Sequence, residues 1–284
     1  MPGVFNGDAG VDDPRNELIH TYFEFVKALN PRIFLMENVP GILWERHKEY
    51  LDQFYRECHD AGYTLFEPVT MDARDFGVPQ RRKRVIILGL EPGLSVENFK
   101  WPPDPTHANP ATISENDDLE PWVSCAKIFE EPDDDVSNNC HMNHGIELTR
   151  AFENTPLNGG SRKDSGRVLT CHKRHDGHKD VYGRINPAHP APTMTTACIN
   201  PSKGRFVHPT EHHGITARQA ARIQTFPDDY VFYGGLIALG KKIGNAVPVA
   251  LGRTIIEHIS TYLLGQDVCV TDSETKINQL SECA

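Results

Sequence analysis

The stretch Ile33-Phe34-Leu35-Met36-Glu37-Asn38-Val39 decides how the first part of this chain folds. Its first four residues are continuously apolar, which is typical of a strand buried on both faces of a sheet. Residues 14–29, which end before Pro31, carry apolar side chains at helical spacing and predict an amphipathic helix. Glu37 and Asn38 are therefore expected just past the carboxyl end of a buried strand, where open α/β sheets place their ligands.

The same alternation of helices and strands continues downstream. A helix is expected over residues 45–61, a strand near residues 63–69 and a second apolar strand over residues 84–90. Helices that alternate with buried strands indicate a parallel sheet. The fold class is therefore α/β.

The middle of the chain lacks this periodicity. From residue 92 to residue 213, prolines recur among many glycines, asparagines, aspartates and histidines, which predicts an irregular inserted domain. Helical spacing returns near residue 216, and the last twenty residues are mostly polar. The expected organisation is one half of an α/β domain over 1–91, the insertion over 92–213, a return to the first domain over 214–264 and a polar tail over 265–284.

Composition restricts the class of protein. The 284 residues contain no apolar run near the roughly 18 residues of a membrane span, so no membrane partner is expected. Residues 1–8 lack the basic flank and apolar core of a signal peptide. Seven scattered cysteines without a Cys-x-x-Cys pair suit a reducing cytoplasm, which is the expected location.

The net charge of −10 is unusual for a protein that binds nucleic acid, so the distribution of charge matters. Acidic residues concentrate in segments 115–120 and 130–135, and basic residues recur over segment 162–184. A duplex could meet the basic segment while the acidic segments face solvent. The alternative, that all three are solvated loops, stays open at this point.

Two further motifs combine polar residues with glycine or proline. Gln80-Arg81-Arg82-Lys83-Arg84 follows Gly77-Val78-Pro79, and Ile243-Gly244-Asn245-Ala246-Val247-Pro248 opens a helix-like stretch. In order and context, these segments and Glu37-Asn38-Val39 resemble the later motifs of DNA cytosine-5 methyltransferases. Other segments that resemble the family in the same order are 5–16, 71–79, 183–184, 190–196, 204–206, 216–222 and 226–228.

The resemblance implies an incomplete Rossmann-like methyltransferase sheet with an inserted irregular target-recognition domain. It also implies S-adenosylmethionine as cofactor, double-stranded DNA as partner, and a place in DNA methylation or restriction-modification. The family's glycine-rich cofactor loop and Pro-Cys nucleophile motif are not found, because aligning Phe5 with the family puts Pro2 at the nucleophile position. We therefore expect the chain to be inactive without an N-terminal methyltransferase subunit or missing segment. The alternative is a non-catalytic DNA-binding or regulatory subunit.

The chemistry of cytosine methylation gives Glu37 its expected role. A thiolate adds at carbon 6, negative charge develops on the ring, and a proton supplied at N3 neutralises that charge. By resemblance, Glu37 grips N3 and the exocyclic amine, and Asn38 orients neighbouring backbone. A glutamate that merely caps the next turn is the alternative interpretation.

The arginine motif is expected to hold the base, because a guanidinium suits a base carbonyl or a phosphate. Arg82 and Arg84 alternate toward a strand and should share one face. By resemblance, one of them, preferably Arg84, holds the flipped cytosine at O2, and the other supports the nucleophile loop. Gln80 is expected to contact DNA or to brace that loop; an exposed basic strand entry is the alternative.

The remaining predicted site residues lie later in the chain. By resemblance, Asn245, Ala246 and Val247 pack against the methionine part of the cofactor, with a helix-start turn as the alternative. Three basic residues of segment 162–184 are expected to face DNA: Lys173, Arg174 and Arg184. Histidines near Cys140 and Cys171 suggest zinc, but the spacing lacks Cys-x-x-Cys and the family requires no metal, so none is expected.

Overall fold

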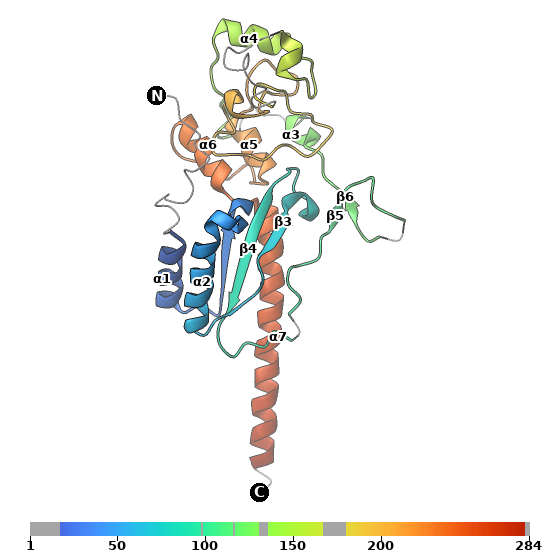
Figure 1. The fold of residues 1–284 in the computed structure, drawn as a ribbon. Coiled ribbons are helices and arrows are strands. Elements are labelled where there is room, and N and C mark those ends of the chain that lie inside the picture. The colour runs from blue at the N-terminus through green and yellow to red at the C-terminus, as the bar shows by residue number, and fades with distance from the viewer. Residues whose placement is uncertain (1–17, 98, 116, 131–135, 167–179, 282–284) are drawn as a thin grey trace. The chain divides into compact units, whose positions relative to one another are not determined.

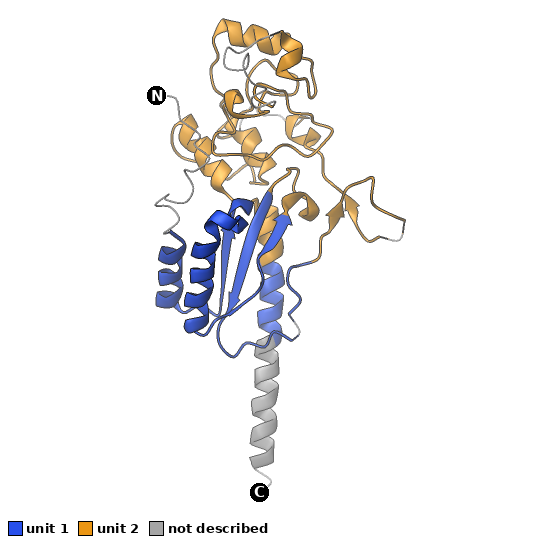
Figure 2. Ribbon diagram, in the orientation of Figure 1, with its two compact units in different colours: residues 1–71, 83–103, 256–284 blue, residues 72–82, 104–255 orange. Residues whose placement is uncertain are grey.

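The computed structural model describes residues 18–97, 99–115, 117–130, 136–166 and 180–281, with side chains given up to residue 265. The chain divides into two compact units (Figure 2). Unit 1 comprises residues 1–71, 83–103 and 256–284, and unit 2 comprises residues 72–82 and 104–255. Each unit is described by itself.

Unit 1 contains the predicted helices and the two predicted apolar strands with shifted ends, but two short strands replace the single strand expected near residues 63–69 (Figure 1). Its helices are α1 (Leu18–Leu29), α2 (Lys48–Asp60) and the later part of α7 (Val249–Ser281), with short 3-10 turns at Pro40–Leu43 and Glu45–His47. Its strands are β1 (Ile33–Asn38), β2 (Thr64–Leu65), β3 (Val69–Asp72) and β4 (Lys83–Leu90). Glu37 and Asn38 lie within β1 rather than past it, because they still pair with Ile86 and Val85.

The predicted parallel pairing is wrong for the described sheet. The strand order is β1-β4-β2, β4 pairs antiparallel with β1 and with β2, and β3 also pairs with β4. Because β1 and β2 both oppose β4, they point the same way, which is what a helical crossover through α2 produces. Only residues 73–82 separate β3 from β4, and a helical crossover to a parallel neighbour needs about a dozen residues or more. Alternation of elements predicted their order but not the reversal of β4.

Both faces of this sheet are covered, as the apolar strands predict. Phe34 and Met36 of β1 face α1 and α2, where Phe23 and Phe54 belong to the same buried cluster. On the other face, Leu88 and Leu90 pack with Tyr262 of α7. Alternate residues of β1 and β4 therefore supply two separate cores. Among the described residues, β1 lies at one end of the strand order.

Unit 2 is built mainly from irregular backbone with short elements. Its helices are α3 (Ala126–Glu130), α4 (Ile146–Glu153), α5 (Ala217–Ile223), α6 (Leu236–Asn245) and the start of α7. A short parallel pair joins β5 (His107–Ala108) to β6 (Glu120–Pro121). The core includes Met194, Ala220 and Ile243, so backbone from both sides of residue 213 packs together. No helix among the described residues is long and apolar enough to span a bilayer.

Gly89 in β4 provides a test of the packing between β1 and β4. It lies directly opposite Phe34, whose ring occupies the space that a side chain at residue 89 would need. Gly89→Ala should therefore lower the free energy of unfolding by about 1–3 kcal/mol, as overpacking does in cores. Urea denaturation followed by circular dichroism measures this. Gly41→Ala, where the added methyl meets only ordinary contacts, is the control and should change stability far less; equal effects would contradict the packing.

Candidate active site

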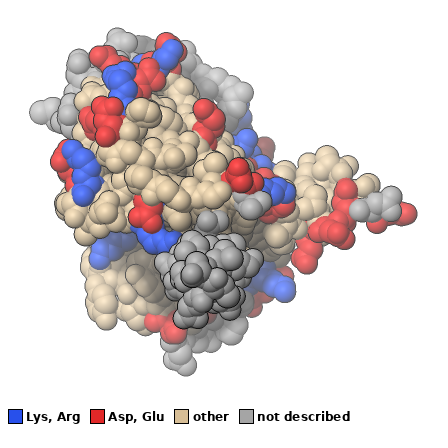
Figure 3. All heavy atoms as spheres, turned by 90° about the horizontal axis from the view of Figure 1, so that it is seen from below, with Lys and Arg blue, Asp and Glu red and all other residues tan. Residues whose placement is uncertain are grey.

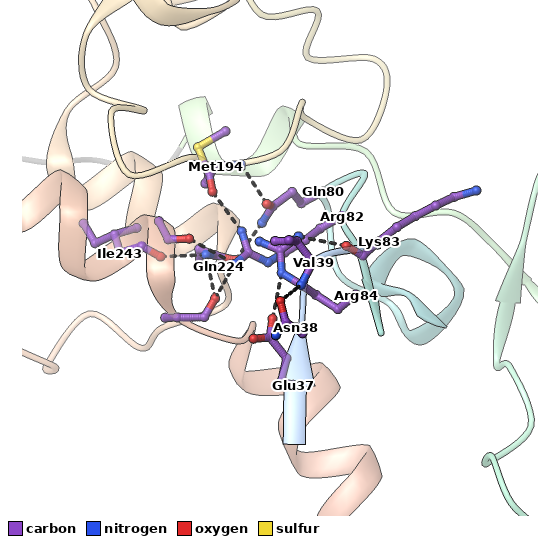
Figure 4. A network of polar contacts seen from close by, with 12 residues as sticks. Glu37, Asn38, Val39, Gln80, Arg82, Lys83, Arg84, Met194, Gln224 and Ile243 are labelled. Carbon is purple, nitrogen blue, oxygen red and sulfur yellow. Dashed lines mark hydrogen bonds and ion pairs between the residues drawn. The ribbon is translucent and has the colours of Figure 1, made fainter. Parts of the chain in front are cut away.

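Glu37 and Arg84 form an ion pair within unit 1 (Figure 4). Oε1 of Glu37 lies 2.7 Å from Nε of Arg84. Ladder register explains the contact, because Glu37 stands opposite Ile86 and Arg84 is two residues from Ile86 on the same face. The side chains are 24% and 12% exposed, so the pair is largely withdrawn from solvent. The two residues that the sequence predicted as base-holding groups thus lie side by side.

The Glu37 carboxylate has hydrogen-bonding capacity that the described residues leave unused. Although Oε1 is close to Arg84, the approach lacks hydrogen-bond geometry, and this buried oxygen accepts no hydrogen bond from the described residues. Buried hydrogen-bond acceptors in native proteins nearly always have a donor, so an acceptor without one is a candidate for binding a ligand. A ligand that donates an N–H group to Glu37 would satisfy it. The neighbouring Asn38 is occupied locally, since its Oδ1 accepts from the backbone N–H of Val39 at 2.8 Å.

Arg82 makes a different set of contacts, with backbone of unit 2. Its guanidinium donates to the backbone carbonyls of Met194 at 2.8 Å, Gly244 at 3.0 Å and Ala246 at 2.8 Å. The side chain is only 1% exposed. Arg82 therefore ties the arginine motif to the backbone of the predicted cofactor motif.

Gln80 and Gln224 extend this network (Figure 4). Gln80 accepts from the N–H of Met194 at 2.8 Å and donates to Oε1 of Gln224, also at 2.8 Å. Gln224 in turn donates to the carbonyls of Ile243 at 2.7 Å and Ala246 at 3.1 Å. Three buried side chains thus hold the backbone of residues 243–246 in one conformation.

These contacts correct two expectations. Gln80 is fully buried, so the predicted contact with DNA is wrong. It braces Met194 and Gln224 instead, and the alternative, that it braces the nucleophile loop, stays a prediction. Arg82 and Arg84 do not act on a common face, because β4 begins at Lys83 and the period of two does not extend back to Arg82. Arg84 binds a carboxylate and Arg82 binds backbone.

The predicted cofactor residues close α6. Asn245 is exposed. Its side-chain amide makes no hydrogen bond with any of the described residues. Ala246 and Val247 are half-buried. The conformation of this segment depends on Gln224, which the sequence analysis missed. One signal was present: Gln224 lies between the matching segments 216–222 and 226–228.

The predicted DNA-facing residues are only partly testable. Arg184 is fully buried and donates to the carbonyls of Phe152, Thr155 and His208, so its predicted exposure to DNA is wrong. Burial lowers the pKa of Arg184. Lys173 and Arg174 lie outside the described residues, and their role stays a prediction. A basic residue in a polar, glycine-rich segment can satisfy buried carbonyls as well as face solvent, which composition alone cannot distinguish.

The acidic segment 115–120 is exposed where the structure describes it. Acidic side chains gather on the connection between β5 and β6, whereas the rest of the face in Figure 3 mixes both signs of charge. This arrangement agrees with the expectation that acid faces solvent.

The cysteines described by the structure are not activated nucleophiles. Burial raises the pKa of Cys58, Cys125 and Cys198 to about 12, and it also raises the pKa of Cys140. Each thiol is therefore protonated near neutral pH, while a nucleophile must be a thiolate. Cys58 lies in α2 as predicted. The side chains of Cys171, Cys269 and Cys283 lie outside the described residues.

Of the histidines that suggested zinc, His141 packs against His213 in unit 2, whereas His172, His175 and His178 lie outside the described residues. The rings of His141 and His213 stack at 3.9 Å, and His208 lies 5.5 Å from His213. In the described part of the chain, no three His, Cys, Asp or Glu side chains converge as a metal site. The pKa of His208 falls to about 4 because of burial and then the neighbouring His213 and Arg184. Its Nδ1 accepts from the backbone N–H groups of Thr210 and Glu211, which requires that nitrogen to be unprotonated.

Known proteins resemble this chain in sequence and in fold. The family model for C-5 cytosine-specific DNA methylase matches residues 6–261. The Type II methylase M.HgiDII of Herpetosiphon aurantiacus is 32% identical, over 88% of this chain and 70% of that protein. The Type II methyltransferase M1.HphI of Haemophilus parahaemolyticus is 28% identical, over 89% and 63% respectively. A prophage-encoded E. coli protein of known structure, described as a DNA modification methyltransferase, has a TM-score of 0.59 at 22% identity, covering 89% and 75%.

Removing the Arg82 guanidinium should destabilise unit 2. Arg82→Met keeps the aliphatic bulk but leaves the carbonyls of Met194 and Gly244 without this donor, while Ala246 keeps its bond from Gln224, so we expect a loss of about 3 kcal/mol in unfolding free energy. Urea denaturation measures it. Lys83→Met, at an exposed neighbour, should stay within about 0.5 kcal/mol of the wild type. A mild effect at Arg82 would show that these hydrogen bonds are dispensable.

His208 makes stability depend on pH. Because its folded pKa of about 4 lies below the ordinary 6.5, the unfolded chain binds a proton first as pH falls. The contribution of His208 to the free energy of unfolding is therefore fully present above pH 6.5 and is lost as pH falls toward 4. The loss from this group is at most about 3 kcal/mol. In melting curves between pH 7 and pH 4.5, His208→Asn, which retains an acceptor, should flatten the decline. The control His59→Asn changes an exposed histidine and should leave the decline as in the wild type. An unchanged pH profile for His208→Asn would refute the role of His208 in this decline.

Proposed function

Because this chain belongs to the C-5 cytosine-specific DNA methylase family, we propose that its residues help to transfer a methyl group from S-adenosylmethionine to carbon 5 of a cytosine in DNA. The family predicted from the motifs is confirmed, and relatives with similar sequences are Type II methyltransferases. One observation carries the finer proposal. It is the buried Oε1 of Glu37, without a hydrogen-bond donor among the described residues, beside the Arg84 guanidinium.

Glu37 is proposed to hold the target base on the side of N3 and the exocyclic amine. The amine would donate to a carboxylate oxygen, which supplies the donor that Oε1 lacks. When a thiolate adds at carbon 6, negative charge spreads to N3, and a proton passes from the Glu37 carboxyl group to N3, which leaves Glu37 as a carboxylate beside Arg84. For these contacts to form, the cytosine must leave the base stack.

Arg84 is proposed to orient Glu37 and to donate toward the base carbonyl at O2. The guanidinium already lies against the carboxylate, and a further N–H donates to the carbonyl of Lys83 at 2.8 Å. A guanidinium has five N–H donors in a fixed plane, so it can hold a carboxylate and a base carbonyl together. Arg84 would then stabilise charge on the ring without itself transferring a proton.

The cofactor would meet the segment Asn245–Val247. Asn245 suits the polar end of a methionine moiety, because its exposed amide both donates and accepts hydrogen bonds. Arg82 and Gln224 hold the carbonyl of Ala246, which presents this segment in a fixed conformation. S-adenosylmethionine, when bound, supplies the electrophilic methyl group.

Two parts of the proposal concern the rest of the enzyme. We propose that the irregular residues 92–213 serve target recognition, since sequence is read by loops that reach base edges. We also propose that the thiolate comes from an N-terminal segment or subunit, because the described cysteines are held as thiols.

Glu37→Gln tests the assignment of the acid. In methyl transfer assays with an N-terminal polypeptide that supplies the nucleophile motif, this variant should lower turnover by roughly a hundredfold or more. DNA binding, measured in parallel, should change much less. Glu49→Gln, an exposed residue on α2, is the matched control and should keep its turnover. Near-normal turnover for Glu37→Gln would remove Glu37 from the mechanism.

A further inference from the structure

Unit 2 contains a pocket of about 640 Å³ that the proposed chemistry does not use. Residues of the lining come from four separated stretches of unit 2: near Arg74 and Arg81, near Asn109 and Trp122, near Asn186 and near Arg205. The Glu37–Arg84 pair belongs to unit 1. The volume falls within the range of ligand sites, which are commonly about 300–1,000 Å³.

Two of the three arginines in the lining are already neutralised. Arg74 binds Asp72 through two hydrogen bonds, at 2.8 and 3.2 Å, and its guanidinium lies 3.8 Å over the ring of Trp122. Arg205 binds Asp180 at 3.2 Å and also donates to backbone carbonyls. Their positive charges are therefore compensated inside the protein.

Arg81 differs from these two. Its side chain is exposed and makes no ion pair or hydrogen bond with any described residue. Its backbone, in contrast, is fixed on both sides: the N–H donates to Ala191 at 2.8 Å, and the carbonyl accepts from Oγ1 of Thr193 at 2.6 Å. Among the described residues, Arg81 is thus a lining arginine without a counter-charge, and its backbone is held in place at the pocket.

Two asparagines add hydrogen-bond donors to the same lining. Oδ1 of Asn109 accepts from the N–H of Ala111, and Oδ1 of Asn186 accepts from the N–H of Ala188, both at 3.1 Å. These turns occupy the two amide oxygens and leave the two amino groups unpaired among the described residues. Arg81 has donors only. The ligand that fits must therefore accept hydrogen bonds and carry about one negative charge.

We propose that this pocket binds one phosphodiester of the DNA backbone, at a nucleotide other than the target cytosine, with Arg81 supplying the charge. A phosphodiester has one negative charge and only acceptor oxygens, whereas a free phosphate or a terminal phosphate carries more charge than Arg81 balances. Arginine is well suited to phosphate oxygens. This inference rests on the proposed function for its DNA substrate but not on the role of Glu37.

The salt dependence of DNA binding tests the inference. Each phosphate neutralised contributes about 0.9 to the slope of log affinity against log salt concentration. Arg81→Ala should reduce that slope by about 0.9, so that between 50 and 200 mM salt the wild type loses about 3.5-fold more affinity than the variant. Mixed-sequence duplexes of several compositions should all be weakened by a similar factor, since phosphate contacts carry no sequence information.

Matched variants separate this effect from a general loss of charge. Arg81→Lys should keep the wild-type slope, because the charge remains. Lys241→Ala removes an exposed charge on α6, away from the lining, and should leave the slope unchanged. Because Arg81 is exposed, all variants should melt like the wild type.

Three outcomes would overturn the inference. An unchanged slope for Arg81→Ala, with normal wild-type binding, would remove the phosphate contact while leaving the proposed function intact. Stabilisation of the wild type, but not of Arg81→Ala, by millimolar inorganic phosphate at matched ionic strength would assign the pocket to free phosphate. A wild-type chain that binds no duplex would overturn both this inference and its DNA substrate. Normal turnover in Glu37→Gln with a reduced slope in Arg81→Ala would refute only the catalytic assignment.

Discussion

The antiparallel ladder between β1 and β4 is the constraint on which the candidate active site depends. It aligns six residue pairs, from Ile33 opposite Leu90 to Asn38 opposite Val85. Because the side-chain period of a strand is two, this register puts Glu37 and Arg84 on one face as diagonal neighbours. A slip of one residue would send them to opposite faces and would also exchange the two apolar cores. Burial of Phe34 and Leu88 on their respective faces therefore protects the geometry of the polar pair.

In unit 2, buried polar groups rather than a regular sheet determine the conformation of the backbone. Irregular segments leave carbonyls without partners from secondary structure, and buried carbonyls must still be satisfied. Arg82 satisfies three of them, and Arg184 satisfies carbonyls from residues 152, 155 and 208. Each arginine thus supplies the hydrogen-bond donors that backbone N–H groups would supply in a sheet. This use explains why basic residues in a loop-rich region lie inside the unit.

Environment also separates residues of the same type into different roles. Arg81, Arg82 and Arg84 are close in sequence. Arg81 is exposed and has no partner among the described residues, Arg82 binds backbone and Arg84 binds a carboxylate. The described cysteines follow the same logic, since burial keeps their thiols protonated and removes them from nucleophilic chemistry. Chemistry in this protein is therefore assigned by burial and partners rather than by residue type.

The sequence by itself determined the family, the α/β character and the identity of the paired residues Glu37 and Arg84. These follow from local features: apolar runs, helical spacing and short motifs whose order survives in the linear chain. Only the tertiary structure decided that β4 runs antiparallel, that Gln80 and Arg184 are buried, and that Gln224 joins the network around Ala246. These features depend on partners more than a hundred residues away in the chain, such as Gln224 for Gln80, or on burial that no local pattern encodes. Hydrogen-bond satisfaction in an irregular interior is a property of the assembled backbone, so it appears only when the chain is folded.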